Sequence, residues 1–245
     1  MTFVLLIAVA GTLMASAETP NTDSPADAAN PVAQVRDNKS WEYGPFVNFG
    51  NGIGDRDNFQ FFRAGFQLGK IITRPLHTWP LPGQFVLGGS VMPLWMAFTP
   101  AEHYENTTCS NTDGQSFPCS LLVEGGIYRG VSIMPVIFRW NFLTKSKRIQ
   151  PWFQAAGGVI YTTHKFPPNP FPTQTINGQT VTIDSGTCVW NFSPQGGFGI
   201  HYFKRSGRSI DIGINAVHIS SASLGDRNPG VNVSVEAQVG YTFWK

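Results

Sequence analysis

The sequence predicts an all-β fold, an eight-stranded antiparallel up-and-down β-barrel of the outer-membrane type. Stretches with a two-residue alternation of apolar and polar side chains recur along the chain, and sustained helical periodicity is lacking after the first 17 residues. Those first residues look like a secretory signal. Only 13% of the residues are charged, about half the fraction that is usual in soluble globular proteins. Together these observations favour a barrel whose wall faces lipid.

The alternating stretches and the turn residues between them divide the chain into eight expected strands. Their ranges are 41–51, 58–72, 84–98, 122–142, 150–163, 188–203, 208–220 and 231–245. Connections near 73–83, 143–149 and 204–207 are mostly short, whereas those near 99–121 and 164–187 are long. This alternation is typical of the two rims of an outer-membrane barrel.

The last strand alternates almost perfectly, with valines, alanine and aromatic residues at the odd positions from 231 to 243 and mostly polar residues between them. The pattern does not tell which face is inward. A soluble barrel or sandwich with an apolar interior therefore stays open as an alternative. In the membrane barrel, we expect tryptophans in girdles at the two interfaces. The expected girdle residues are Trp79, Trp95, Trp140, Trp152 and Trp244.

The N-terminal region divides into two segments before the barrel domain at 41–245. Residues 1–17 read as a signal peptide cleaved after Ala17, and an N-terminal anchor helix is the alternative. Residues 18–40 are rich in Asp, Ala, Pro, Asn and Ser, so we expect a disordered lead-in.

Composition and spacing exclude several partners. A net charge of +2 with few charged residues does not suit a protein that binds nucleic acid by neutralising phosphates. The histidines and cysteines lack metal-ligand spacing, so we expect no metal site. Cys109 and Cys119 flank a polar loop and are expected to form a disulfide in an oxidising compartment, which leaves Cys188 over.

The strand expected at 208–220 carries the one combination of residues that suggests chemistry. His218 and Ser220 share the face of Ile210, Ile212 and Ile214. Residues two apart on a strand point the same way, at Cα atoms roughly 6.5–7 Å apart, which lets a histidine base reach a serine nucleophile. If the apolar face meets lipid, His218 lies about 20 Å above Ile210, at the far interface, where a polar group facing lipid costs little.

This strand end resembles the lipid A 3-O-deacylase family, also called acyloxyacyl hydrolases or PagL-like proteins. The resemblance rests on AVHISSASLGDRNPG and the strand after it. It extends more loosely to WEYGPFVNFGNG, VMPLWMAFTP, YTTHKFP and NFSPQGGFGIHYF, and so covers most of 41–245. It implies an eight-stranded outer-membrane barrel that uses no cofactor. It also implies hydrolysis of the ester-linked 3-position acyl chain of lipid A, from lipopolysaccharide in the outer leaflet, by a Ser/His/acid triad on the outer wall.

The resemblance assigns roles to four residues here. Ser220 would be the nucleophile and His218 the general base. The oxyanion would be held by donors near Ser221 and Ser223. The family commonly has Asn directly after the serine, whereas this chain has Ser221, whose hydroxyl is a less fixed donor.

The third member of the triad departs further from the family pattern. The position of the family's acid falls on Asn232, which can orient an imidazole but cannot stabilise imidazolium by charge. Strand alternation also turns Asn232 away from the face of His218. Asp226 in the preceding loop is the second candidate, and Glu236 would serve if the register shifted.

Two arginines in neighbouring loops are candidate contacts for the phosphates of lipid A. Arg56 and Arg227 lie in the similar strings GDRDN and GDRNP, and barrel closure would bring these loops together. Two rival functions remain at the level of the sequence. One is a small outer-membrane barrel with a structural or adhesive role, and the other is a soluble periplasmic barrel that binds an apolar ligand.

Overall fold

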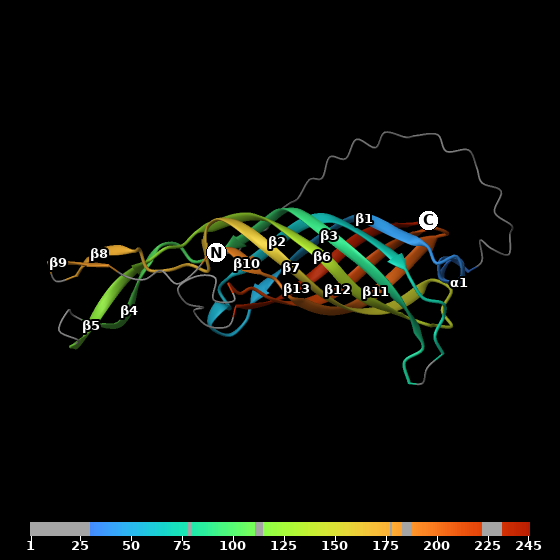
Figure 1. The fold of residues 1–245 in the computed structure, drawn as a ribbon, viewed down its shortest axis with the longest axis horizontal. Helices are drawn as coiled ribbons and strands as arrows, with labels where there is room; N and C mark the ends of the chain where they lie inside the picture. The colour runs from blue at the N-terminus through green and yellow to red at the C-terminus, as the bar shows by residue number, and fades with distance from the viewer. Residues whose placement is uncertain (1–29, 78–79, 111–114, 177, 183–187, 222–231) are drawn as a thin grey trace.

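The computed structural model describes residues 30–77, 80–110, 115–176, 178–182, 188–221 and 232–245. The predicted signal peptide at 1–17 lies outside these residues. Figure 1 shows an elongated barrel with both the C-terminus and the short helix at one end and two hairpins projecting from the other. In the described part of the chain, no helix is long and apolar enough to cross a bilayer.

The barrel wall has eight antiparallel strand positions, as the sequence predicts, and each position is called a stave here. Each strand pairs with the next, β13 pairs with β1, and this last pairing closes the sheet. β10 and β11 both pair with β7 and form successive parts of one stave. The strands of the barrel are β1 (Trp41–Gly52), β2 (Gln60–Ile71), β3 (Gly83–Phe98), β6 (Ile127–Phe142), β7 (Ile149–Phe166), β10 (Cys188–Phe192), β11 (Gln195–Arg205), β12 (Arg208–His218) and β13 (Val233–Trp244).

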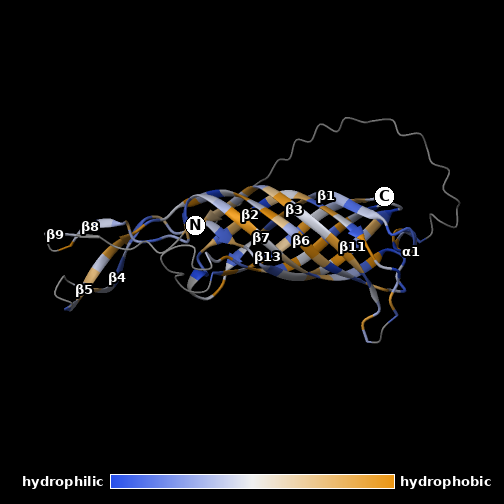
Figure 2. Ribbon diagram, viewed as in Figure 1, coloured by the Kyte–Doolittle hydropathy of each residue, from blue (hydrophilic) through white to orange (hydrophobic). Residues whose placement is uncertain are grey.

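The barrel is apolar outside and polar inside. Its wall exposes large hydrophobic side chains along the strands, and much of the barrel is orange in Figure 2. Outward residues include Phe49, Phe66, Leu68, Val91, Ile133, Phe138, Phe198, Ile212, Ile214 and Val239. Buried polar residues include Glu42, Asn48, Arg63, Gln67, Arg139, Gln154, His201, Asp211, Asn215, Glu236 and Gln238. A soluble barrel would have the opposite pattern, so the soluble alternative is wrong.

The predicted tryptophan girdles are also wrong for the residues that the structure describes. Trp95, Trp140, Trp152 and Trp244 are all buried. Trp152 fills the interior against glycines, because a Cβ at Gly213 would come within 2.6 Å of its ring. On the outer wall, Trp41 and Trp190 are the tryptophans that are exposed, at opposite ends of the barrel. Trp79 lies outside the described residues.

Two hairpins extend the barrel at the end opposite the chain's C-terminus (Figure 1). The first joins β4 (His103–Ser110) to β5 (Ser116–Val123), and the second joins β8 (Thr173–Ile176) to β9 (Gln179–Thr182). A disulfide links Cys109 to Cys119, the pairing that the sequence predicts. Gly126, with a φ of +108°, separates β5 from β6, so the strand expected at 122–142 begins later than predicted.

The other end of the barrel is covered by α1 (Pro31–Asp37). Asn30 caps this helix by accepting the backbone N–H of Ala33 at 3.1 Å, and Pro31 occupies the first turn. Val32 and Val35 are buried in a cluster with Ile71, Val86, Phe203 and Trp244. The sequence predicts a disordered lead-in over 18–40, whereas residues 31–37 are helical. The apolar positions of this short segment are buried by the barrel end, a tertiary contact that composition does not reveal.

Candidate active site

His218 and Ser220 lie on the outer wall at the hairpin end of the barrel. Along β12 the even positions from 210 face outward and the odd positions face the lumen. His218 and Ser220 are half-buried on the outward side, as strand alternation predicts. Val217 and Ile219, at 1% and 2% exposure, point inward on either side of His218. The strand therefore presents the histidine and the serine to the surroundings of the barrel.

An apolar cluster inside the barrel fixes this part of the chain from behind. Val217 and Ile219 belong to a buried cluster with residues of β2, β3, β6 and β7. At its centre, the ring of Phe166 contacts the rings of Phe59, Phe61, Trp95 and Tyr128 at centroid distances of 5.3–6.3 Å. Because the inner neighbours are packed, the outward direction of His218 and Ser220 is set by the core and by strand geometry.

Backbone hydrogen bonds hold the two residues against β10 and the start of β11. The N–H of His218 donates to the carbonyl of Pro194 at 2.9 Å. Ser220 and Phe192 exchange two backbone hydrogen bonds, of 2.7 and 3.0 Å. Ser220 thus continues the ladder beyond the end of β12. Its hydroxyl and the imidazole of His218 are neighbours on one face, an arrangement that suits a base and a nucleophile.

Asn232, the first candidate for the orienting residue, lies on the lumen side. β13 places Val233 opposite His218, so Asn232 turns inward, and it is buried. Its carbonyl accepts the N–H of Ile219 at 2.8 Å. Its side-chain Oδ1 accepts a hydrogen bond from Arg56 Nε at 3.1 Å. The structure therefore brings Asn232 to Arg56 and not to His218.

Glu236, the alternative that requires a register shift, is occupied elsewhere. Its carboxylate is 1% exposed and pairs with Arg63, with Nη2 and Oε2 2.6 Å apart. Ser234 Oγ donates to its other oxygen at 2.8 Å. In the observed register, Glu236 lies opposite Asn215 on the lumen face. The structure thus gives Glu236 the role of a lumen ion-pair partner.

The remaining predicted site residues fall in or beside the segment 222–231. Ser223, Asp226 and Arg227 lie outside the described residues. Ser221 is buried and has the inward parity of Val217 and Ile219. Its hydroxyl is thus on the face opposite to Ser220, which leaves its backbone N–H as the group that could serve an oxyanion.

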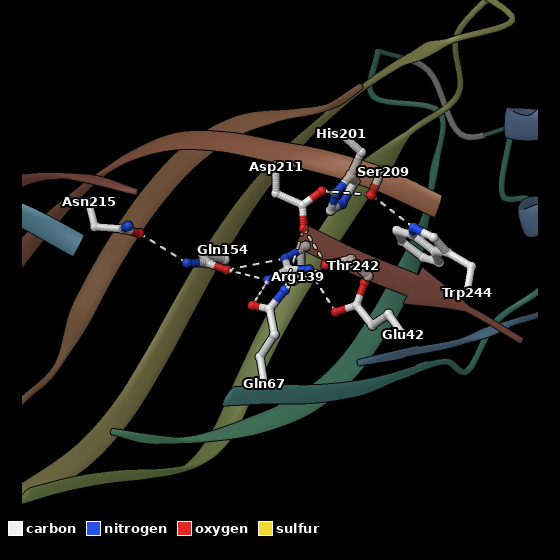
Figure 3. A network of polar contacts seen from close by, with 10 residues as sticks. All are labelled: Glu42, Gln67, Arg139, Gln154, His201, Ser209, Asp211, Asn215, Thr242 and Trp244. Carbon is white, nitrogen blue, oxygen red and sulfur yellow. Dashed lines mark hydrogen bonds and ion pairs between the residues drawn. The ribbon is translucent and has the colours of Figure 1, made fainter. Parts of the chain in front are cut away.

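The barrel interior holds a polar network that sequence reasoning missed (Figure 3). Arg139 crosses the lumen to Glu42, with Nη1 and Oε1 2.6 Å apart, and also donates to Gln154 and Gln67. Nearby, His201 Nδ1 lies 2.7 Å from Asp211, which also accepts from Ser209. In the sequence, these residues appear as polar side chains at alternate positions along several strands. This pattern indicates a network in the lumen only when the inward direction of those positions is known.

Among the described residues, no group of three histidine, cysteine or acidic side chains gathers in a way that could hold a metal ion. The acidic residues of the lumen are paired with arginine or histidine.

The profile of one protein family matches residues 89–242, a range that includes His218, Ser220 and Asn232. That family is described as lipid A 3-O-deacylase (PagL). The chain belongs to the PagL family. The family assignment confirms the resemblance that the sequence shows at the end of the seventh stave.

The chain is similar to two solved structures. The crystal structure of the outer membrane enzyme PagL is 14% identical, with a TM-score of 0.47, over 82% of this chain and 98% of that one. The crystal structure of Neisserial surface protein A (NspA) is 11% identical, with a TM-score of 0.45, over 83% of this chain and 96% of that one. No curated protein matched the chain.

Proposed function

We propose that this member of the PagL family is an outer-membrane serine esterase that removes the 3-position acyl chain of lipid A. The observation that carries the proposal is the position of His218 and Ser220, side by side on the apolar outer wall. A nucleophile on that face meets lipid directly. The family supplies lipid A as the substrate class.

We infer the orientation of the protein in the membrane from its two barrel ends. Outer-membrane barrels have short periplasmic turns and longer extracellular loops. The hairpins β4–β5 and β8–β9 lie at the same end as His218, and α1 and the C-terminus lie at the other. We therefore place the active site at the outer leaflet, close to the ester bonds of lipid A.

The proposed reaction has two steps. Ser220 Oγ attacks the ester carbonyl carbon while His218 takes its proton. The tetrahedral intermediate then collapses, the bond to the sugar oxygen breaks, and His218 returns the proton to that oxygen. In the second step, His218 activates a water that hydrolyses the acyl-enzyme and releases the fatty acid.

We assign the orientation of His218 to Asp226. Asn232 and Glu236 bond to Arg56 and Arg63 on the lumen side, as strand parity requires. Asp226 follows Ser221 by five residues in the sequence and is the remaining acidic candidate. A carboxylate bonded to the imidazole would stabilise the imidazolium by charge, which an asparagine cannot do.

The test is mass spectrometry of lipid A from cells that express the wild-type protein, compared with cells that carry an empty vector. We expect lipid A that lacks one ester-linked acyl chain, and fragmentation should place the loss at the 3-position. Lipid A of unchanged mass from cells with folded protein would exclude the deacylase and favour the structural or adhesive barrel. Loss of a chain from another position would keep the esterase and change its specificity.

Arg56 and Arg227 are proposed to bind lipid A phosphates. Replacing both with glutamine should lower kcat/KM on phosphorylated lipid A by about ten-fold, because charged hydrogen bonds to phosphate are lost. Phosphatase-treated lipid A should show a smaller loss. Arg148→Gln, a change of the same kind at the opposite barrel end, serves as the control. Equal losses on both substrates would refute the phosphate contact.

A further inference from the structure

A polar hollow lies at the hairpin end of the barrel. It has a volume of about 440 Å³, within the range of small-ligand sites. Its walls come from the first loop, from the β4–β5 hairpin and from the segment after β7. The residues that characterise it are Arg56, Phe59, His103, Glu105, Glu124 and Asn169.

The wall of this hollow is built by main-chain hydrogen bonds. Glu124 N–H donates to the carbonyl of Asn169 at 2.8 Å, and Phe171 N–H donates to that of Leu122 at 3.0 Å. Val123 forms a β-bridge with Pro170 between them. These bonds join the base of the hairpin to the segment after β7, so the hollow is preformed and binding need not order its walls.

The lining chemistry suits a sugar. Glu105 and Glu124 supply acceptors for hydroxyl groups, and the guanidinium of Arg56, which is bonded through Nε to Asn232, lies in the same lining as a donor group. The partly exposed rings of Pro100, Pro168 and Pro170 offer apolar contacts for the C–H faces of a pyranose ring.

The hollow adjoins the candidate active site through Arg56. Arg56 lines the hollow and donates from Nε to Asn232 Oδ1, and the carbonyl of Asn232 accepts the N–H of Ile219. The next residue is Ser220. A lipid whose ester group lies at Ser220 would direct its headgroup away from the bilayer, toward the end of the barrel that carries the hollow.

We propose that the hollow is a saccharide subsite, which binds sugars of the glycolipid headgroup beyond its acylated part. The proposal rests on the deacylase function. It predicts that the enzyme acts better on lipopolysaccharide that carries its saccharide than on free lipid A, because binding energy from the sugars contributes to kcat/KM.

The experiment uses full-length protein folded in detergent micelles. Deacylation of saccharide-bearing lipopolysaccharide and of free lipid A is compared for the wild type and for the double variant Glu105→Gln/Glu124→Gln. We expect the double variant to lower the ratio of the two kcat/KM values by about ten-fold, the effect of two weakened hydrogen bonds. Glu102→Gln, an exposed change of the same kind beside the hollow, should keep the wild-type ratio.

A direct binding measurement separates this proposal from the deacylase function. Oligosaccharide released from lipopolysaccharide is titrated into the protein and followed by saturation-transfer NMR. Binding by the wild type that weakens in the double variant supports the subsite, even if neither lipid substrate is deacylated. Lack of oligosaccharide binding, or a ratio of kcat/KM values that is equal in wild type and double variant, would overturn it.

Discussion

Replacing Ser220 with alanine is expected to reduce kcat for lipid A deacylation by at least about 10³-fold, and replacing His218 with alanine should cost about as much. The reason is that nucleophile and base act as one unit, so each is of little use without the other. The double variant should therefore be no slower than either single variant. The measurement is single-turnover release of fatty acid from lipid A in mixed micelles.

The matched control is Ser120→Ala, which removes an exposed hydroxyl from the β4–β5 hairpin and should leave the rate unchanged. All variants should keep the heat-modifiable migration of a folded barrel on gels. A double variant whose loss equals the product of the two single losses would contradict the proposal, because it would mean that His218 and Ser220 act independently.

Removing the carboxylate of Glu236 is expected to destabilise the barrel strongly. In Glu236→Ala, Arg63 stays in the lumen without its 2.6 Å ion-pair partner. Leaving one member of a buried ion pair unpaired typically costs about 3–5 kcal/mol. Equilibrium unfolding by urea in lipid vesicles should show this loss as a lower midpoint.

Two comparisons sharpen this prediction. The double variant Arg63→Met/Glu236→Leu should recover much of the loss, because neither charge is left alone in the interior. Val239→Ile, a change on the lipid face of the same strand, should have little effect. If Glu236→Ala kept wild-type stability and lost all activity, Glu236 would belong to the catalytic machinery and its assignment to the lumen would be wrong.

Eight alternating stretches, the low charge and the signal-like N-terminus predicted the barrel, and alternation along 208–220 predicted the shared face of His218 and Ser220. Alternation is a local property of a strand, so it survives without knowledge of the neighbours. A single strand did not show which of its two faces points into the barrel. This direction required the closed sheet, in which polar side chains from many strands meet in the narrow interior.

Other features depended on irregularities that the sequence does not mark. The pairing of β3 with β6 shifts register between Gly88 and Ser90 and again between Met92 and Trp95. The second shift moves the inward face of β3 from even to odd positions, because Ser90 and Met92 are buried before it and Trp95 and Ala97 after it. This change explains how Trp95 comes to be inside. The helix at 31–37 is stabilised because the end of the barrel, formed by residues far away in the sequence, buries its apolar side chains. The sequence left the third catalytic residue open among Asn232, Asp226 and Glu236. The spacing from His218 alone did not decide between them.

The crossing of the lumen by Arg63 and Arg139 also bears on permeability. Each guanidinium reaches from one side of the barrel to a carboxylate on another stave, Glu236 or Glu42, and α1 covers the end near the C-terminus. A solute that entered the barrel would have to break these charged pairs in succession. The protein should thus conduct no ions across planar bilayers, and a cell could hold many copies of this lipid-facing enzyme without compromising its permeability barrier.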